Sequence, residues 1–273
     1  MRSVWYPGHM ARARAKILEV LPMVDLVVEV RDARAPLSSR SPESGLISSR
    51  KPVGVVLSKA DLAEEEVTGR WLELLAREGF EFCVALDLRE GSCRRELSRL
   101  VRRGPRPDAR RERRVMVVGI PNVGKSTLIN ALAGRRRASV APVPGHTRGL
   151  QFYRAEGFLL LDTPGVLEPG EGAELQRRLA WIGCVRADVI GGHYKLAVEL
   201  LSFLRSRGLM GRVLSRYGFD EAEGEAMEVI SRIGRSRGFL LRGGEVNLEE
   251  AAKDLLMEFS SGGLGRVSLE VPP

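Results

Sequence analysis

Apolar residues in the first part of the chain gather into short runs separated by helical patterns. The runs read as buried strands and lie at residues 24–30, 52–57 and 80–85. Apolar positions at helical spacing predict helices at residues 11–21, 64–78 and 93–102. Strands that alternate with helices predict a parallel sheet with helices on both faces, the doubly wound α/β class.

The pattern changes after residue 102. Residues 102–114 contain two prolines, a glycine and seven arginines, which is a linker composition. A strand is then predicted at 115–118, and two apolar runs predict a hairpin that closes on Glu156 and Gly157. Beyond about residue 175 only helical patterns remain, at residues 174–184, 196–206, 221–233 and 248–259. We therefore expect an α/β domain over 1–175 and a smaller all-α domain over 176–273.

Residues 119–126 read GIPNVGKS and stand between an apolar strand and a helix. This matches the phosphate-loop pattern G-x-x-x-x-G-K-[ST] in the context that the pattern requires. Backbone N–H groups of such a loop bind phosphate, and the following helix N-terminus adds positive potential. We expect Lys125 to reach the β- and γ-phosphates and Ser126 to ligate Mg²⁺. The predicted nucleotide contacts are Asn122, Val123, Gly124, Lys125, Ser126 and Thr127.

A second phosphate-side motif, D-x-x-G, follows at residues 162–165. Asp162 ends an apolar strand one hairpin after the phosphate loop, where a Mg²⁺-holding acid is needed, and the Gly165 N–H is expected to contact the γ-phosphate. Between the two motifs, residues 144–149 read PGHTRG and offer Thr147 as a hydroxyl that coordinates Mg²⁺ only when a γ-phosphate is present. A loop without function is the alternative for this segment.

Residues 58–61 read SKAD, after an apolar strand and before a helix. The Asp61 carboxylate can accept from both N1–H and the exocyclic amine of guanine, while the Lys59 stem lies along the base. Adenine has no donor at N1, so ATP would leave Asp61 unsatisfied. A helix N-cap is the alternative role for Asp61.

The order of these motifs, with the guanine-reading residues before the phosphate loop, resembles that of circularly permuted GTPases, specifically the ribosome biogenesis GTPase A family. The matching segments are WYPGHM at 5–10, VRDARAP at 30–36, SKAD at 58–61, residues 119–127, DTPG at 162–165 and GRVSLE at 265–270. The resemblance implies a circularly permuted P-loop GTPase domain followed by a helical domain that binds RNA or the ribosome. It also implies GTP hydrolysis to GDP and phosphate, rRNA contact and a role in large ribosomal subunit assembly.

The residue after the D-x-x-G glycine is Val166, where conventional GTPases have a glutamine that positions the attacking water. An aliphatic chain cannot orient water, so we expect slow turnover alone and stimulation by ribosomal particles. The resemblance implies that His9 acts catalytically on the particle, beside Lys125 and Thr147, although a surface histidine is the alternative. It also implies that Asn122 helps to hold K⁺, with a local loop hydrogen bond as the alternative.

Two segments depart from the family pattern. Ser58 stands where the usual motif has asparagine, which predicts a lower guanine affinity. The third base-contacting segment, at the end of the strand near residue 85, matches poorly and leaves the Ala85 backbone N–H to meet guanine O6.

Composition changes this picture little. The net charge is +8 and arginine dominates the basic residues, which suits a nucleic-acid partner but also a GC-rich genome or a hot habitat. The three cysteines are far apart and form no disulfide or zinc pattern. No run nears the roughly 18 apolar residues that span a bilayer, so we expect a cytoplasmic protein with no membrane partner.

Two alternatives stay open at this point. A P-loop ATPase or kinase with a small substrate would share residues 119–126 but need neither Asp61 nor the Thr147 loop. An RNA-binding module that GTP merely stabilises, with negligible turnover, would explain Val166 and the arginine excess.

Overall fold

The structure is a computed structural model that describes the chain except for residues 1–6, 106–110, 134–138, 141–151, 168–171 and 221–223. Contacts divide the chain into two units. An α/β unit extends to Pro169 and is rejoined by Ser268–Pro273, and a helical unit spans Gly170–Val267. The division therefore differs from the expected 1–175 and 176–273, because the end of the chain returns to the α/β unit.

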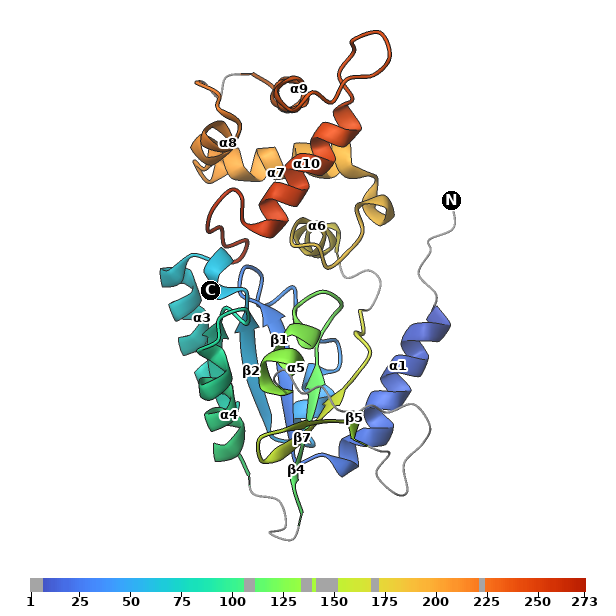
Figure 1. Cartoon of the computed structure of the whole chain (residues 1–273), viewed down its shortest axis with the longest axis vertical. Coiled ribbons are helices and arrows are strands. Elements are labelled where there is room, and N and C mark those ends of the chain that lie inside the picture. Colours follow the sequence, from blue (N-terminus) through green and yellow to red (C-terminus); the bar gives the residue numbers. More distant parts are fainter. Residues whose placement is uncertain (1–6, 106–110, 134–138, 141–151, 168–171, 221–223) are drawn as a thin grey trace. The chain divides into compact units, whose positions relative to one another are not determined.

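Seven strands form one sheet in the described part of the α/β unit, in the order β3-β2-β1-β4-β7-β6-β5. Figure 1 labels β1, β2, β4, β5 and β7 of this sheet. Their bounds are β1 Leu26–Asp32, β2 Val53–Ser58, β3 Phe82–Leu86, β4 Arg113–Val118, β5 Ser139–Val140, β6 Phe152–Ala155 and β7 Phe158–Asp162. The pairs among β3, β2, β1, β4 and β7 are parallel. The predicted hairpin is confirmed: β6 and β7 are antiparallel, with Ala155 opposite Phe158 and Glu156-Gly157 as the turn.

The sheet order confirms the circularly permuted arrangement. The strand that feeds the phosphate loop, β4, is central, with β1 to β3 on one side and β7 to β5 on the other. A chain that started at β4 would build the same sheet and add β1, β2 and β3 last. The circular permutation therefore changes where the chain begins and ends but leaves every strand in the same place in the sheet.

The helices of this unit connect parallel strands or flank them. Their bounds are α1 Pro7–Val20, α2 Ser44–Ser48, α3 Glu65–Arg77, α4 Cys93–Arg103 and α5 Lys125–Ala133, with short 3-10 turns at Leu21–Met23 and Ala60–Leu62. Ile17 of α1 packs with Met116 and Phe152, and Trp71 of α3 packs with Leu57. Every residue of β1 is buried, so both faces of this central strand are covered, as expected for a doubly wound sheet.

The described part of the second unit consists of helices joined by turns, with an isolated antiparallel bridge between Leu240 and Val246. Its elements are α6 Ala173–Trp181, a 3-10 turn Ala187–Ile190, α7 His193–Ser206, α8 Met210–Tyr217, α9 Ala226–Arg237 and α10 Leu248–Ser261. Helix α7 packs on α9 and α10, with Leu200, Ile230 and Leu255 fully buried. The ring centroid of Trp181 lies 5.4 Å from that of Phe203, and the indole N–H donates to the Leu196 carbonyl. The unit thus has its own apolar core.

Among the described residues, no helix has the length and apolar character that crossing a bilayer demands.

Candidate nucleotide-binding site

The predicted site residues follow strands whose carboxyl ends meet at one edge of the sheet. Strand register sets Asp32 opposite Ser58 and Val117 opposite Asp162. The direction of strand order reverses between β1 and β4, which are neighbours. Ligands of doubly wound sheets bind in the crevice outside such a switch point. The fold therefore brings the base-reading and phosphate-side motifs to the same edge.

The phosphate loop is a tight turn between β4 and α5. Gly119 has φ +150°, and a Cβ there would lie 2.6 Å from the Val30 carbonyl oxygen, so only glycine fits. Asn122 adopts the left-handed conformation at φ +61°. The buried Lys125 folds back along the loop, where its Nζ donates to the Ile120 carbonyl at 2.8 Å. The loop and the α5 N-terminus form the geometry that binds phosphate.

The D-x-x-G segment lies directly against this loop. A Cβ on Gly165 would come within 2.8 Å of Lys125 Nζ and 2.9 Å of the Pro121 backbone nitrogen. The next residue, Val166, is only 3% exposed and packs in the core beside Phe152. Gly165 is therefore close enough to the phosphate loop to respond to its ligand, while Val166 serves packing.

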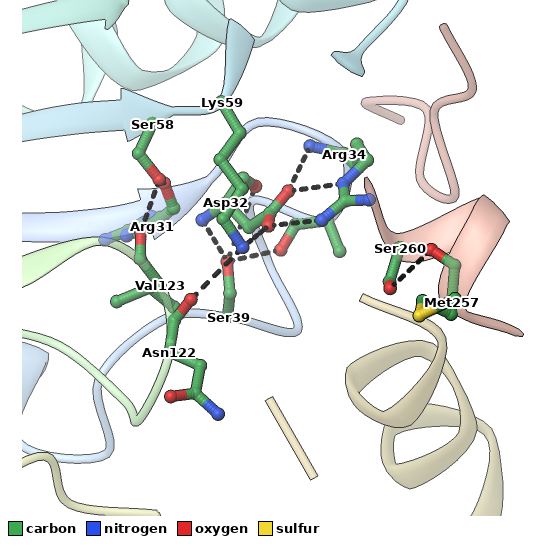
Figure 2. A network of polar contacts seen from close by, with 11 residues as sticks. Arg31, Asp32, Arg34, Ser39, Ser58, Lys59, Asn122, Val123, Met257 and Ser260 are labelled. Carbon is green, nitrogen blue, oxygen red and sulfur yellow. Dashed lines mark hydrogen bonds and ion pairs between the residues drawn. The ribbon is translucent and has the colours of Figure 1, made fainter. Parts of the chain in front are cut away.

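Two links join the predicted guanine-reading segment to the phosphate loop (Figure 2). The Ser58 hydroxyl lies within hydrogen-bonding distance of the Val123 and Arg31 carbonyl oxygens. The Lys59 ammonium donates to the Asn122 carbonyl oxygen at 3.1 Å. Ser58 thus links the end of β2 directly to the phosphate loop, a contact that the sequence analysis did not predict.

Asp61 has one carboxylate oxygen engaged and one without a partner. Its Oδ2 accepts from the Arg89 guanidinium at 2.5 Å. Its Oδ1 is shielded from solvent and accepts no hydrogen bond from a described residue. Such an orphaned acceptor is costly unless a ligand supplies a donor. The predicted Ala85 lies within β3 opposite Leu57, and Arg89, which contacts Asp61, lies in the loop that follows this strand.

The sequence analysis also did not identify the buried carboxylate that forms an ion pair with Lys59. Asp32, at the end of β1, accepts hydrogen bonds from the Arg34 guanidinium at 2.9 Å and pairs with Lys59 at 3.0 Å (Figure 2). Burial alone would raise the pKa of Asp32, but the charges and hydrogen bonds of Arg34 and Lys59 outweigh it and hold the pKa below its ordinary value. Its place in the VRDARAP segment was the available signal.

Comparison with known proteins agrees with this geometry. The profile of the 50S ribosome-binding GTPase family matches residues 114–194. The Bacillus cereus ribosome biogenesis GTPase A is 36% identical over 98% of this chain and 93% of its own length. The ribosome biogenesis GTPase A of Thermotoga maritima is 35% identical over 98% of this chain and 94% of its own length. The chain belongs to the ribosome biogenesis GTPase A family.

Solved structures from this family support the assignment. The GDP-bound and GNP-bound structures of YlqF from Thermotoga maritima each superpose with a TM-score of 0.72, at 31% and 30% identity. They cover 94% and 96% of this chain, and this chain covers 99% and 98% of theirs. Membership of the ribosome biogenesis GTPase A family decides the enzyme class: the chain is a GTPase, not a small-substrate kinase or a non-hydrolysing module.

The oxygen donors at this GTPase site suit Mg²⁺. The Ser126 hydroxyl is exposed in the first turn of α5, and Asp162 ends β7 beside β4. Hydroxyl and carboxylate oxygens are the hard ligands that Mg²⁺ prefers beside substrate phosphates. Thr147 lies outside the described residues, and His9 lies in the first turn of α1 with its side chain outside the described part.

Proposed function

We propose that this GTPase is a switch protein that acts in the assembly of the large ribosomal subunit, in contact with rRNA and, in a bacterial cell, in the cytoplasm. The observation that carries the proposal is the pair of links from Ser58 and Lys59 to the phosphate loop. They make base recognition and phosphate binding parts of one site. The names of the relatives, ribosome biogenesis GTPase A and, in cattle, mitochondrial ribosome-associated GTPase 1, support the assembly role.

Guanine is selected by the orphaned acceptor of Asp61. The Oδ1 atom accepts a hydrogen bond from the N1–H of guanine, while Oδ2 accepts from both Arg89 and the exocyclic amine. ATP offers no N1 donor and leaves this oxygen unpaired. A site built to bond a donor rejects an analogue without it by orders of magnitude, which favours GTP and GDP over adenine nucleotides.

The phosphates are held by the loop from Asn122 to Thr127, with Lys125 at the β- and γ-oxygens. Ser126, Asp162 and Thr147 would hold Mg²⁺, which when bound would offset the charge that develops on the phosphate oxygens. Asn122 is the proposed K⁺ ligand. Since Val166 is a core residue, His9 is the proposed group that orients the attacking water when a ribosomal particle is bound.

The output of the switch is the helical unit. Gly165 contacts the phosphate loop, and the chain enters α6 at Ala173 soon afterwards. A γ-phosphate that shifts Gly165 therefore acts on the helical unit through a short covalent connection. We assign ribosome and rRNA binding to this unit together with the α/β unit.

Competition binding tests the base-reading step on which this function depends. Fluorescent GDP is displaced by unlabelled GTP, ATP or xanthosine triphosphate from the wild type and from Asp61→Asn, whose amide offers a donor where the carboxylate accepts. We expect GTP to compete far better than ATP, and Asp61→Asn to lose GTP affinity and gain xanthosine triphosphate affinity. Equal competition by ATP and GTP would overturn the proposal. Turnover with and without ribosomal particles, in wild type and His9→Ala, then tests the partner.

A further inference from the structure

Helix α4 of the GTPase unit has two chemically distinct faces. Its buried residues are Cys93, Leu97, Ser98 and Val101. Its exposed residues include five arginines, Arg94, Arg95, Arg99, Arg102 and Arg103, which we call the α4 arginine face. At about 100° per residue these five side chains fall within one half-turn opposite the apolar stripe of Cys93, Leu97 and Val101. At about 1.5 Å per residue they extend over roughly 13 Å of the helix axis.

The charge on this face is hardly neutralised by the protein. Among the described residues, Arg102 forms an ion pair with Glu156 at 3.2 Å, and that carboxylate is 72% exposed. None of the other four arginines forms an ion pair with a described residue. The helix contains one acidic residue, Glu96. A helix face that only keeps a protein in solution usually mixes charges of both signs, so this one-sided surface calls for an anionic partner.

Helix α4 is anchored to the sheet by hydrogen bonds at its C-terminal end and by buried apolar side chains. The buried guanidinium of Arg113 in β4 donates to the Val101 carbonyl and, at 2.7 Å, to the Gly104 carbonyl. It thereby satisfies the last carbonyls of α4, where a cation is also favoured by the helix dipole. Leu97 and Val101 are fully buried. The arginines therefore project from a fixed support, above a shallow hollow that they line together with Ser98 and Glu156.

We propose that the α4 arginine face binds the phosphate backbone of RNA. Guanidinium groups donate bidentate hydrogen bonds to phosphate oxygens, and several at helical spacing neutralise successive phosphates. A protein partner would need apolar or aromatic anchors, yet all the large exposed apolar residues of the described chain lie outside α4. The contact carries no base readout, so its sequence specificity is low.

The inference deepens the proposed contact with rRNA, because it names a surface on the GTPase unit rather than on the helical unit. It rests on the proposed function only for the identity of the natural RNA. Binding of a generic RNA duplex and ribosome-stimulated turnover are separate measurements. One can fail without the other.

Fluorescence anisotropy with a labelled RNA duplex of about two helical turns and arbitrary sequence tests the proposal, with GDP present, between 50 and 300 mM KCl. The variant Arg95→Gln/Arg99→Gln/Arg103→Gln removes three charges from the face. Its matched control, Arg40→Gln/Arg50→Gln/Arg77→Gln, removes three exposed arginines elsewhere on the same unit. Glu156→Gln removes the carboxylate that pairs with Arg102.

We expect the α4 variant to bind RNA on the order of tenfold more weakly, with a salt slope smaller by about two to three, since each phosphate contact contributes about 0.7–0.9. The control triple variant should retain most of the affinity and slope, and Glu156→Gln should bind more tightly. GTP turnover without RNA should match the wild type in all three variants, which shows that they fold. Equal losses in the two triple variants would overturn the α4 assignment alone. No RNA binding by the wild type at 50 mM KCl would overturn it together with the rRNA contact, while tight binding of an acidic peptide but not RNA would replace RNA by a protein partner.

Discussion

Asp32 and Lys59 form an ion pair in which Oδ2 lies 3.0 Å from Nζ and the carboxylate is fully buried. The pair joins the end of β1 to the loop that follows β2, and Lys59 then reaches the Asn122 carbonyl in the phosphate loop. A fully buried residue at the end of β1 therefore holds in place a side chain that we expect to read the base. Arg34 supplies the second cation to Asp32, so the carboxylate keeps its charge despite burial.

Asp32→Asn is expected to weaken GDP binding and to destabilise the fold. Removing one partner of a buried ion pair typically costs about 3–5 kcal/mol, because the remaining charges stay buried. The folded-state pKa of Asp32 is below the unfolded value of about 3.9, so its contribution to stability is present above about pH 4 and is lost as the pH falls through the folded-state pKa. In urea unfolding, the free energy of unfolding of the wild type minus that of the variant should be constant from pH 6 to 8.

The same difference should shrink progressively below about pH 4, because the unfolded chain then binds a proton at Asp32 that the folded protein binds only at a lower pH. A difference that persists unchanged to the lowest pH would mean that packing, not charge, accounts for the effect. Ser39→Ala is a suitable control, because the Ser39 hydroxyl accepts from the Asp32 backbone N–H without touching the carboxylate charge.

Arg89→Ala is expected to tighten guanine nucleotide binding. The Arg89 guanidinium donates to Asp61 Oδ2, the oxygen that in our proposal it shares with the guanine amine. Arg89 is 67% exposed, and exposed ion pairs are worth up to about 1 kcal/mol, so the gain in affinity should not exceed about fivefold. Stopped-flow association of fluorescent GDP should show the gain mainly in the association rate. An affinity that falls severalfold would show instead that Arg89 holds Asp61 in its binding position.

The strands and the phosphate-side site could be predicted because their signals are local. Apolar runs fixed the positions of β1, β2 and β3 to within two residues at each end, and the phosphate-loop pattern located the β4 to α5 turn. The short helix α2 was missed because its five residues carry no period that a window can detect. Helix α8 was missed despite its eight residues, and it follows α7 after a turn at Gly208.

Contacts between distant segments could not be predicted in this way. Arg89 is 28 residues from Asp61, and nothing in the intervening sequence indicates their pairing. The Ser58 link to Val123 depends on β2 and β4 ending at the same edge, with β1 between them. The Arg113 contact with the end of α4 similarly arises only when the sheet is assembled. These details follow from strand order, which patterns along one segment do not encode.

Glu270→Ala is expected to release the end of the chain from the α/β unit. The buried Glu270 carboxylate accepts from the Leu37 backbone N–H at 2.7 Å, the Ser38 backbone N–H at 3.0 Å and the Ser38 hydroxyl. Hydrogen bonds to a charged group contribute about 1.5–3 kcal/mol each, and their loss is partly offset by water, so we expect a decrease of about 2–4 kcal/mol in the free energy of unfolding. Denaturant unfolding measures it.

Val271→Ala, at a half-exposed neighbour, serves as the control and should change stability by less than about 1 kcal/mol. If Glu270→Ala were as stable as this control, the contacts of Ser268–Pro273 would contribute nothing measurable to the stability of the α/β unit. The contact matters because Leu37 and Ser38 follow the β1 end that carries Asp32 and Arg34.

Gly165→Ala is expected to uncouple the nucleotide state from the switch while leaving the fold intact. Its Cβ would lie 2.8 Å from Lys125 Nζ and 2.9 Å from the Pro121 nitrogen, so either the D-x-x-G segment or the phosphate loop must move away. The backbone N–H of residue 165 then no longer reaches a γ-phosphate, and the preference for a non-hydrolysable GTP analogue over GDP should be lost. Competition binding measures the affinities of the GTP analogue and of GDP for each protein. As a control, Gly69→Ala replaces an exposed helical glycine where an added Cβ meets no neighbour, and it should leave both affinities unchanged. A Gly165→Ala protein that still distinguishes the two nucleotides as the wild type does would show that the γ-phosphate is sensed elsewhere, and Thr147 would then be the residue to substitute next.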